Sequence, residues 1–292
     1  MTRKHEYERP GGRSGDGAPK TRRMPAALRG KPFRRLQREF YQRYYRYPHR
    51  NFLVTALPKS GSTWIARMLL ELPGTFRWFP ERFNTQTLKD PDFHEFAEQD
   101  LLRPPPGYTV TKVHAGPSAH NRDILHRAGR PYVVLVRDLR DIAVSWAHFV
   151  AIRPENAFYN ETKDLDLSGR IDHFIENILP IFAAWERGWR RHIHPDLGML
   201  IAYEDLLADT RSVMSRVFTH YGVPRTDTEL TRIIEAHTFA RTTGRAAGDE
   251  NAKDFNRKGI AGDWQNHLTD EQAQRIVAPT LLGGEGDSAA AG

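Results

Sequence analysis

Short apolar runs alternate along the chain with segments in which apolar residues recur every three or four positions. Four of the runs have the length and the β-branched content of strands, near residues 52–57, 108–113, 131–136 and 198–203. Helical patterns separate them, which is typical of β-α-β units around a parallel sheet. Continuously apolar strands are expected where both faces of a sheet are covered. The pattern therefore predicts a three-layer α/β/α fold with a central parallel sheet.

The first fifty residues follow a different pattern. Residues 1–30 are rich in Gly, Pro, Arg and Lys, and we expect a disordered basic arm. Spacings of three and four residues then predict an amphipathic helix over about residues 33–47. Its apolar stripe comprises Phe33, Leu36, Phe40, Tyr44 and Tyr47. Residues 31–282 are expected to form one catalytic domain, followed by a disordered tail over residues 283–292.

Charge is concentrated at the N-terminus. The chain has 292 residues and a net charge of +7, but residues 1–50 hold 15 Lys or Arg and 4 Asp or Glu, which leaves −4 for the remainder. The favoured interpretation is that the helix over residues 33–47 packs its apolar stripe on the domain. Peripheral contact with an anionic lipid surface is the alternative. Nucleic-acid binding is not expected, because no recognition motif accompanies the charge.

Several classes of protein are disfavoured by composition. No apolar run has the length of a membrane span, and the N-terminus lacks the apolar core of a secretory signal, so we expect a cytoplasmic protein. The chain has no Cys and no metal-ligand spacing, so we expect no metal site. Asp92, His94 and Glu95 lie close together without a partner cluster, and a solvated segment is expected there.

The first candidate motif lies between a strand and a helix, at residues 57–64. Such a loop can cradle a phosphate with its backbone N–H groups and the helix N-terminus, and Lys59 adds a full charge. In the common nucleotide loop, G-x-x-x-x-G-K-[ST], the Lys follows the Gly, whereas Lys59 precedes Gly61. The alternative is an ordinary strand-to-helix turn capped by Ser62 or Thr63.

Two further segments offer anion-binding groups. Arg137 follows the apolar strand 131–136, and Ser145 lies two turns into the next helix. Both could reach one anion beyond the carboxyl ends of the strands, where α/β folds bind ligands. Residues 255–264 place Arg257 and Lys258 before a Gly in a loop, a flexible cationic clamp. A surface ion pair of Arg137 and a solvated basic loop are the alternatives.

These three segments, in this order, resemble the cytosolic-type sulfotransferases. That family moves a sulfonate from 3′-phosphoadenosine 5′-phosphosulfate (PAPS) to an acceptor hydroxyl or amine. Its donor loop, P-K-S-G-T-T-W, matches residues 58–64 with Ser62 in place of one Thr, and R-K-G-x-x-G-D-W matches residues 257–264 throughout. The 3′-phosphate motif R-x-x-x-D-x-x-V-S is matched by Arg137, Asp141, Val144 and Ser145. The resemblance spans roughly residues 50 to 275.

The resemblance implies a role for each matching residue. His114 corresponds to the general base of the family pattern K-T-H, Lys112 to its second active-site Lys, and Lys59 to the cation beside the departing oxygen. The donor loop would be formed by Ser60, Gly61, Ser62, Thr63 and Trp64. The 3′-phosphate would be held by Arg137, Ser145, Arg257, Lys258 and Gly259. The adenine would be held by Trp64, Tyr203, Thr238 and Phe239, although the segment at Thr238 is one residue short.

Other readings of the function stay open. A P-loop kinase or ATPase would need a Lys after Gly61 and an acidic metal ligand, and a nucleotide-binding protein without activity would not need His114. The chain departs from the family at residues 115–118 and 77–106, so the acceptor is left open among small molecules, lipids and glycosides. The family's dimer motif is not visible after Trp264, which leaves the oligomeric state open.

Overall fold

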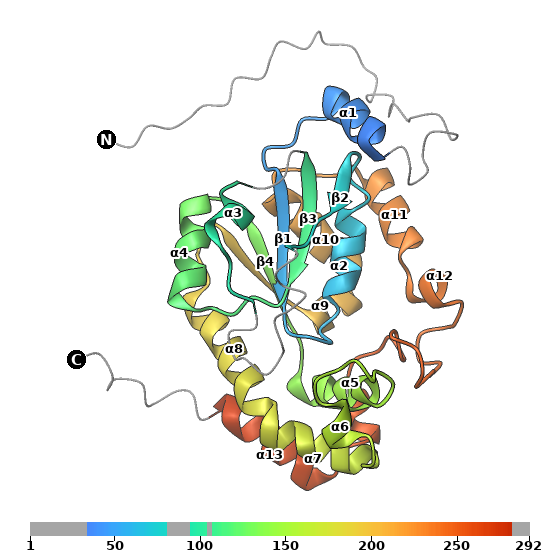
Figure 1. Ribbon diagram of the computed structural model, residues 1–292. Coiled ribbons are helices and arrows are strands. Elements are labelled where there is room, and N and C mark those ends of the chain that lie inside the picture. The colour runs from blue at the N-terminus through green and yellow to red at the C-terminus, as the bar shows by residue number, and fades with distance from the viewer. Residues whose placement is uncertain (1–33, 81–93, 104–106, 282–292) are drawn as a thin grey trace, which may run out of the picture.

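The computed structural model describes residues 34–80, 94–103 and 107–281 (Figure 1). The predictions of a disordered arm at residues 1–30 and a disordered tail at residues 283–292 fall outside these ranges. Five parallel strands form one sheet in the order β2-β3-β1-β4-β5. The strands are β1 (Asn51–Ala56), β2 (Thr75–Arg77), β3 (Tyr108–Val113), β4 (Tyr132–Val136) and β5 (Gly198–Ala202).

The four predicted strands are confirmed, each within one residue at either end. The edge strand β2 was not predicted, because three residues are too few to show a hydrophobic period. The helices of the first half are α1 (Arg34–Tyr44), α2 (Ser62–Leu69), α3 (Glu98–Leu101), α4 (Ala119–Ala128), α5 (Leu139–Ala151) and α6 (Tyr159–Thr162). Those of the second half are α7 (Leu167–Asn177), α8 (Leu179–His192), α9 (Tyr203–Ala208), α10 (Thr210–His220), α11 (Asp227–Ala236), α12 (Phe239–Thr243), the 3₁₀ turn η4 (Asp263–Asn266) and α13 (Asp270–Leu281).

Alternate strand residues enter two separate cores, which makes the three layers. On one face, Leu53 and Val134 pack with side chains of α4, α5, α7 and α8. On the other, Val54 and Val133 pack with side chains of α2, α10 and α11. Strands buried on both faces can be apolar throughout, and each fully buried Val or Leu contributes about 1.5–3 kcal/mol. The predicted α/β/α architecture is confirmed.

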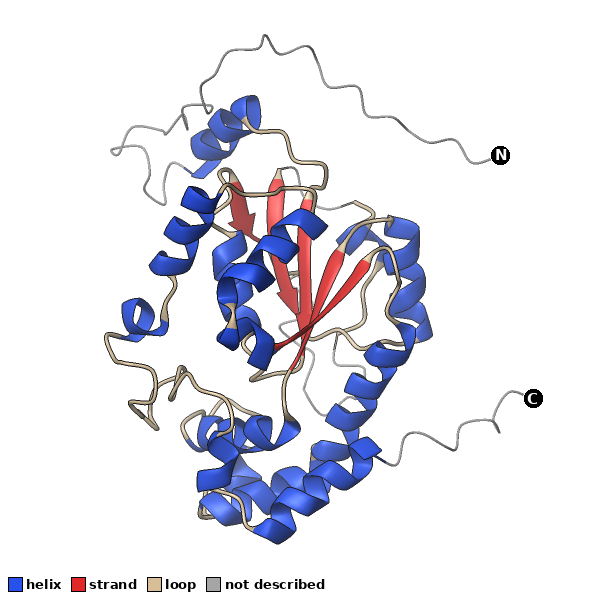
Figure 2. Ribbon diagram, turned by 180° about the vertical axis from the view of Figure 1, so that it is seen from behind, coloured by secondary structure: helices blue, strands red, loops and turns tan. Residues whose placement is uncertain are grey.

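The sheet topology brings the candidate segments to one edge. Strand β1 lies in the middle, between β3 and β4, so the chain leaves it toward one side of the sheet and later returns to the other. Open α/β sheets bind ligands at such a switch point, beyond the carboxyl ends of the strands. Lys59 follows β1, His114 follows β3, Arg137 follows β4 and Tyr203 follows β5. Helices α5, α7 and α13 lie beyond this edge (Figures 1 and 2).

Helix α1 lies at the opposite end of the sheet (Figure 1). The predicted helix is present, but its predicted stripe is only partly buried, since Leu36 is 51% and Tyr44 is 40% exposed. The helix ends at Tyr44, before the last residue of the stripe, Tyr47. Tyr47 does dock on the domain, since its hydroxyl donates to the carbonyl of Pro73 at 3.0 Å and its ring packs on Tyr108. Tyr41, one position from the stripe, packs beside Gly74. Phe33 is outside the described residues.

Across the described ranges, the helices are all too short or too polar to cross a bilayer.

Candidate active site

The donor loop makes a tight turn between β1 and α2. Lys59 has a φ of 69° and Gly61 a φ of 86°, both in the left-handed region. Such a conformation is uncommon for a non-glycine residue and costs about 1–3 kcal/mol, so Lys59 is held there by its surroundings. Gly61 is needed because a Cβ would lie 2.5 Å from the ring of Tyr203. The buried Ser60 hydroxyl donates to the carbonyl of Leu57 and shapes the turn.

The Lys59 side chain lies between two aromatic rings. Its Nζ is 4.1 Å from the ring centroid of Phe255 and 4.5 Å from that of Phe149. Burial, with help from the positive charges of Arg137, Lys112, Arg153 and Arg257, lowers the pKa of Lys59 to about 7. These cations lie near enough to Lys59 to act on its charge. An anion beside Lys59 would be attracted by several cations at once.

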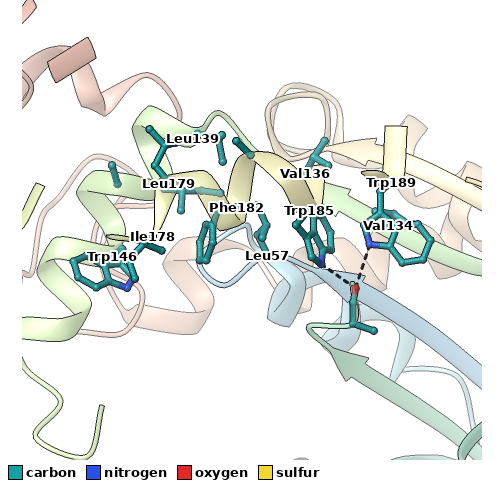
Figure 3. Close-up of a cluster of buried hydrophobic side chains, with 14 of the residues drawn as sticks. Leu57, Val134, Val136, Leu139, Trp146, Ile178, Leu179, Phe182, Trp185 and Trp189 are labelled. Atoms are coloured by element: carbon teal, nitrogen blue, oxygen red, sulfur yellow. Dashed lines mark hydrogen bonds between the residues drawn. The ribbon is translucent and has the colours of Figure 1, made fainter. Parts of the chain in front are cut away.

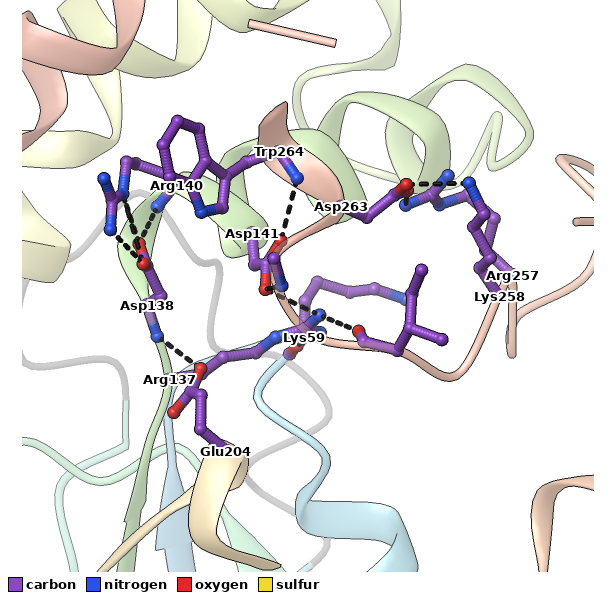
Figure 4. A network of polar contacts seen from close by, with 12 residues as sticks. Lys59, Arg137, Asp138, Arg140, Asp141, Glu204, Arg257, Lys258, Asp263 and Trp264 are labelled. Atoms are coloured by element: carbon purple, nitrogen blue, oxygen red, sulfur yellow. Dashed lines mark hydrogen bonds and ion pairs between the residues drawn. The ribbon is translucent and has the colours of Figure 1, made fainter. Parts of the chain in front are cut away.

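Arg137 ties the first and third motifs together (Figure 4). Its guanidinium donates to the carbonyl of Lys59 at 3.0 Å and to the carbonyl of Ile260 at 3.1 Å. The same group stacks on Tyr203, with 4.3 Å from Cζ to the ring centroid. The side chain is 11% exposed. Arg137 therefore fixes two loops that are about 200 residues apart in the chain.

Asp141 anchors the third motif to the start of α5. Its buried carboxylate accepts hydrogen bonds from the backbone N–H of Gly262 at 2.7 Å and of Trp264 at 3.1 Å. It also lies 3.6 Å from the guanidinium of Arg137. The sequence motif contains Asp141, but no role could be assigned to it before the loop was placed. Its role here is to position the loop that carries the two adjacent cations.

Those two cations, Arg257 and Lys258, are held by carboxylates. Arg257 donates to Glu250 at 2.8 Å and pairs with Asp263, and the Nζ of Lys258 lies 2.7 Å from Asp263. Burial alone would raise the pKa of Asp263, but hydrogen bonds from Lys258, Asn266 and Arg257 lower it below its ordinary value. Two carboxylates thus balance the two cations of this loop and hold it in place.

Ser145 and Gly259 complete this region. Half-buried Ser145 precedes His148 by three positions on α5, so both lie on one face of the helix. His148 in turn approaches Glu250, with 3.8 Å between Nε2 and the carboxylate. Gly259 has a φ of 70°, and a Cβ there would lie 2.3 Å from the ring of Phe239. The second motif therefore faces the third across a short distance.

The predicted adenine-binding residues line a neighbouring stretch. The indole N–H of Trp64 donates to the carbonyl of His237 at 2.8 Å, which joins the donor loop to the segment before α12. Phe239 packs against Gly259, and Tyr203 packs against Gly61. The hydroxyl of Thr238 accepts from the N–H of Arg241 and caps α12. Ser62 is buried in the first turn of α2, and Thr63 is half-buried beside it.

His114 lies at the end of β3 with a defined tautomer. Its Nδ1 is 2.6 Å from the carbonyl oxygen of Ala56, which can only accept, so Nδ1 carries the proton and Nε2 carries the lone pair. Nε2 is 3.4 Å from the Nζ of Lys112. Burial, with help from the charge of Lys112, holds the pKa of His114 well below its ordinary value. Burial also lowers the pKa of Lys112, to about 8. A neutral imidazole with a free Nε2 is the form that can accept a proton.

Comparison with known proteins agrees with this arrangement. Residues 49–278 match the sulfotransferase domain family. The chain belongs to that family. It is 24% identical over 249 residues to Sulfotransferase 6B1 of Danio rerio, covering 77% of this chain and 75% of that protein. It is 23% identical over 254 residues to human Sulfotransferase 1C2, covering 77% and 80%.

Solved structures show the same fold. Mouse sulfotransferase SULT7A1, complexed with PAP, matches with a TM-score of 0.61 at 18% identity, covering 80% of this chain and 84% of that one. Retinol dehydratase in complex with androsterone and the inactive cofactor PAP matches with a TM-score of 0.56 at 17% identity, covering 86% and 85%. The protein is thus a sulfotransferase, and the kinase or ATPase alternative is not favoured.

The structure of this sulfotransferase corrects one expectation from sequence. His94 is not solvated but is 5% exposed, and its Nδ1 accepts the backbone N–H of His114 at 2.8 Å. No period or motif marks this position, because the contact joins two segments that are apart in the chain and lie side by side only in the fold. The same holds for Phe149 and Glu250, whereas Phe255 begins the motif at residues 255–264 but had no role assigned to it.

One grouping near the cations has the composition of a metal site. His148, Glu250 and His267 offer ligand atoms within 4.8 Å of one another, which sequence spacing did not reveal. However, Glu250 is paired with Arg257, and His267 lies 3.2 Å from Asp263. Burial, followed by the positive charge of Arg257, lowers the pKa of His148 to about 4. The same positive charge opposes the binding of a metal cation. That the enzyme needs no metal stays a prediction.

Proposed function

We propose that the protein transfers a sulfonate from PAPS to a hydroxyl or amine of a small-molecule, lipid or glycoside acceptor. The observation that carries this proposal is the meeting of the cationic segments at one edge of the sheet. Arg137 donates to the carbonyls of Lys59 at 3.0 Å and Ile260 at 3.1 Å, and Nε2 of His114 lies 3.4 Å from Nζ of Lys112. A donor with a sulfonate, a 5′-phosphate and a 3′-phosphate needs such an array, since several anionic groups must be matched. That PAP is present in the two solved structures described above supports the same donor.

The donor would be held by charge on one side and by rings on the other. Arg257 and Lys258 offer N–H groups to the 3′-phosphate, with Ser145 and the backbone at Gly259 as further donors and Arg137 as an additional cation. The backbone of Ser60, Gly61, Ser62 and Thr63 would cradle the 5′-phosphosulfate at the N-terminus of α2. The adenine would stack among Trp64, Tyr203 and Phe239, with Thr238 at the border. Each charge-assisted contact contributes about 1.5–3 kcal/mol.

The chemical step follows from the positions of three side chains. The acceptor oxygen forms a bond to sulfur while the bond from sulfur to the bridging phosphate oxygen breaks. The acceptor proton passes to Nε2 of His114, which carries the lone pair because Nδ1 donates to Ala56. Negative charge grows on the bridging oxygen, and Lys59 stabilises it after leaving its two aromatic neighbours. Lys112, now close to His114, would turn toward the sulfonate and so release Nε2 for the acceptor.

Transfer of radioactive sulfonate from labelled PAPS to a panel of acceptors tests the proposal. We expect turnover with at least one hydroxyl or amine compound and none with ATP as donor. The product bisphosphate should raise the melting temperature without magnesium, whereas a kinase or ATPase would respond to ATP with magnesium. Stabilisation by ATP-magnesium alone would disprove the proposed donor. Stabilisation by the bisphosphate without turnover on any acceptor would favour a nucleotide-binding protein that lacks activity.

We also propose peripheral contact of residues 33–47 with an anionic lipid surface. Leu36 and Tyr44 are 51% and 40% exposed, and Phe40 lies between them on the same side of α1. Residues 1–50 carry a net charge of +11, whereas the remainder of the chain carries −4. Exposed apolar side chains next to positive charge suit the interface of a membrane that contains anionic lipids. An acceptor dissolved in that membrane would then be close to the enzyme.

A further inference from the structure

We propose that His94 is a positioning residue for the general base, and that it acts by holding the backbone of His114. The proposal rests on the function proposed above, in which His114 removes the acceptor proton. The Nδ1 of His94 accepts the backbone N–H of His114 at 2.8 Å, and the two imidazole rings are stacked with 5.7 Å between centroids. His94 is 5% exposed, so this bond is shielded from competing water.

The hydrogen bonds fix the tautomers of both rings. A backbone N–H can only donate, so Nδ1 of His94 must carry a lone pair. A backbone carbonyl can only accept, so Nδ1 of His114 must carry its proton toward Ala56. The main chain of His114 is therefore bound to His94 while its side chain is bound to Ala56. With both held, the direction in which Nε2 of His114 points is set.

Helix α4 keeps His94 in place through Asn121, which is fully buried. The side-chain amide of Asn121 donates to the carbonyls of His94 at 3.0 Å and of Gly116 at 2.9 Å. Its oxygen accepts the N–H of Phe96 at 2.8 Å. One side chain thus joins the segment before α3 to the segment that follows His114, so the two move as one unit.

The other side of His114 is bound just as firmly. The carbonyl of Ala115 accepts a hydrogen bond from the hydroxyl of Thr55 at 2.9 Å. It also accepts from the indole N–H groups of Trp185 at 2.9 Å and Trp189 at 3.1 Å, the two dashed lines in Figure 3. Helix α8 and strand β1 therefore hold the carbonyl of Ala115. The backbone N–H of His114 is the second group whose position sets the tilt of the base, and His94 binds it. A displacement of about 1 Å in a reacting group can cost a factor of about 10² in rate.

Two amide variants separate the hydrogen bond from the volume of the ring. In His94→Asn the side-chain oxygen can occupy the place of Nδ1 and still accept the N–H of His114, whereas in His94→Gln the amide reaches beyond that place. We expect single-turnover rates within about threefold of wild type for His94→Asn and about 10- to 100-fold lower for His94→Gln. The acceptor KM and the bisphosphate Kd should change by no more than about twofold in either variant.

His120 supplies the matched control, because its Nε2 lies 2.7 Å from the carbonyl of Phe96 in the same segment. His120→Leu should lower the melting temperature about as much as His94→Gln yet keep the turnover rate within about twofold of wild type. Equal rate losses in His94→Gln and His120→Leu, equal rates in the Asn and Gln variants, or an effect on acceptor KM alone would each overturn the proposal. Near-normal turnover of His114→Ala would instead refute the proposed base.

Discussion

The two sides of the active site are held by different forces. On the donor side, Arg137, Arg257 and Lys258 are bound by Asp141, Asp263 and Glu250, and nearly every contact involves a charge. On the acceptor side, most groups that hold His114 are neutral, namely a backbone carbonyl, a second imidazole and, through Ala115, two indoles, and Lys112 is the cation beside it. The donor is a multiply charged anion, whereas the base must stay neutral until it takes a proton.

The two sides therefore differ in what determines their specificity. Burial lowers the pKa of Lys59, and repulsion by the nearby cations adds to that effect. Binding of an anionic donor relieves this repulsion, so the donor side should be sensitive to the charge of the nucleotide. The acceptor side holds fewer charges and depends mainly on direction, so small displacements should matter there. Four measurements test this difference between the two sides.

Nucleotide discrimination is the largest effect expected from the donor side. In the proposed donor complex, Arg257 and Lys258 contact the 3′-phosphate. A nucleotide without that phosphate should lose two or more contacts, each of about 1.5–3 kcal/mol. We expect 3′-phosphoadenosine 5′-phosphate to bind about 10³-fold more tightly than AMP in calorimetry. Arg257→Ala should weaken the bisphosphate at least about tenfold and leave AMP unchanged. Equal affinities for the two nucleotides would end the assignment of PAPS.

Loss of the base is the largest effect expected from the acceptor side. His114→Ala should lower turnover by about 10²–10⁴-fold while the affinity for the bisphosphate stays within about twofold. Because the pKa of His114 is held well below its ordinary value of 6.5, the base stays neutral at pH 6.5 and loses activity only at lower pH. The acid limb of kcat/KM should therefore lie below pH 6.5. An acid limb at or above that value would contradict the neutral, buried environment described here.

Truncation of the N-terminus should leave both sides of the site intact. Deleting residues 1–30 should change neither folding nor donor binding, whereas deletion through Tyr47 removes a half-buried ring and its bond to Pro73. The loss of Tyr47 and Tyr41 contacts should destabilise the protein by about 2–5 kcal/mol. Thermal melts measure this effect. If lipid contact is the main role of residues 33–47, the melting temperature should hold while sedimentation with anionic vesicles is lost.

Proton uptake on donor binding is the smallest effect and the most specific to the donor side. Lys59 has a pKa of about 7, so it is largely neutral at pH 8. An adjacent anion favours the charged form and raises that pKa, so Lys59 should take up close to one proton when the bisphosphate binds at pH 8. At pH 6 the side chain is already charged, and uptake by Lys59 should vanish. Calorimetry of the bisphosphate in buffers of different ionisation enthalpy measures the number. Lys59→Met should remove this proton, and the smaller uptake by Lys112, which has a pKa of about 8, should remain.

Sequence alone determined the layers and pointed to the candidates for the donor side, for a physical reason. Buried parallel strands need continuous apolar runs, and a phosphate-binding loop needs a Lys, a Gly and a helix start close together in the chain. Such features are local, so the four long strands and the candidates Lys59, Arg257 and Lys258 could be found from neighbouring residues. The family resemblance added a role for each of them and for His114, and those roles stay predictions.

The tertiary structure decided what joins those local pieces. Asp141 binds a loop about 120 residues away, Phe149 and Phe255 meet around Lys59, and His94 meets the backbone of the base across the fold. Helix α1 shows the same limit, since its period and Tyr47 were identified from the sequence, but the contact of Tyr41 and the exposure of Leu36 and Tyr44 were not. A period says that one side of a helix is apolar, whereas only the surface it meets determines which side chains are buried.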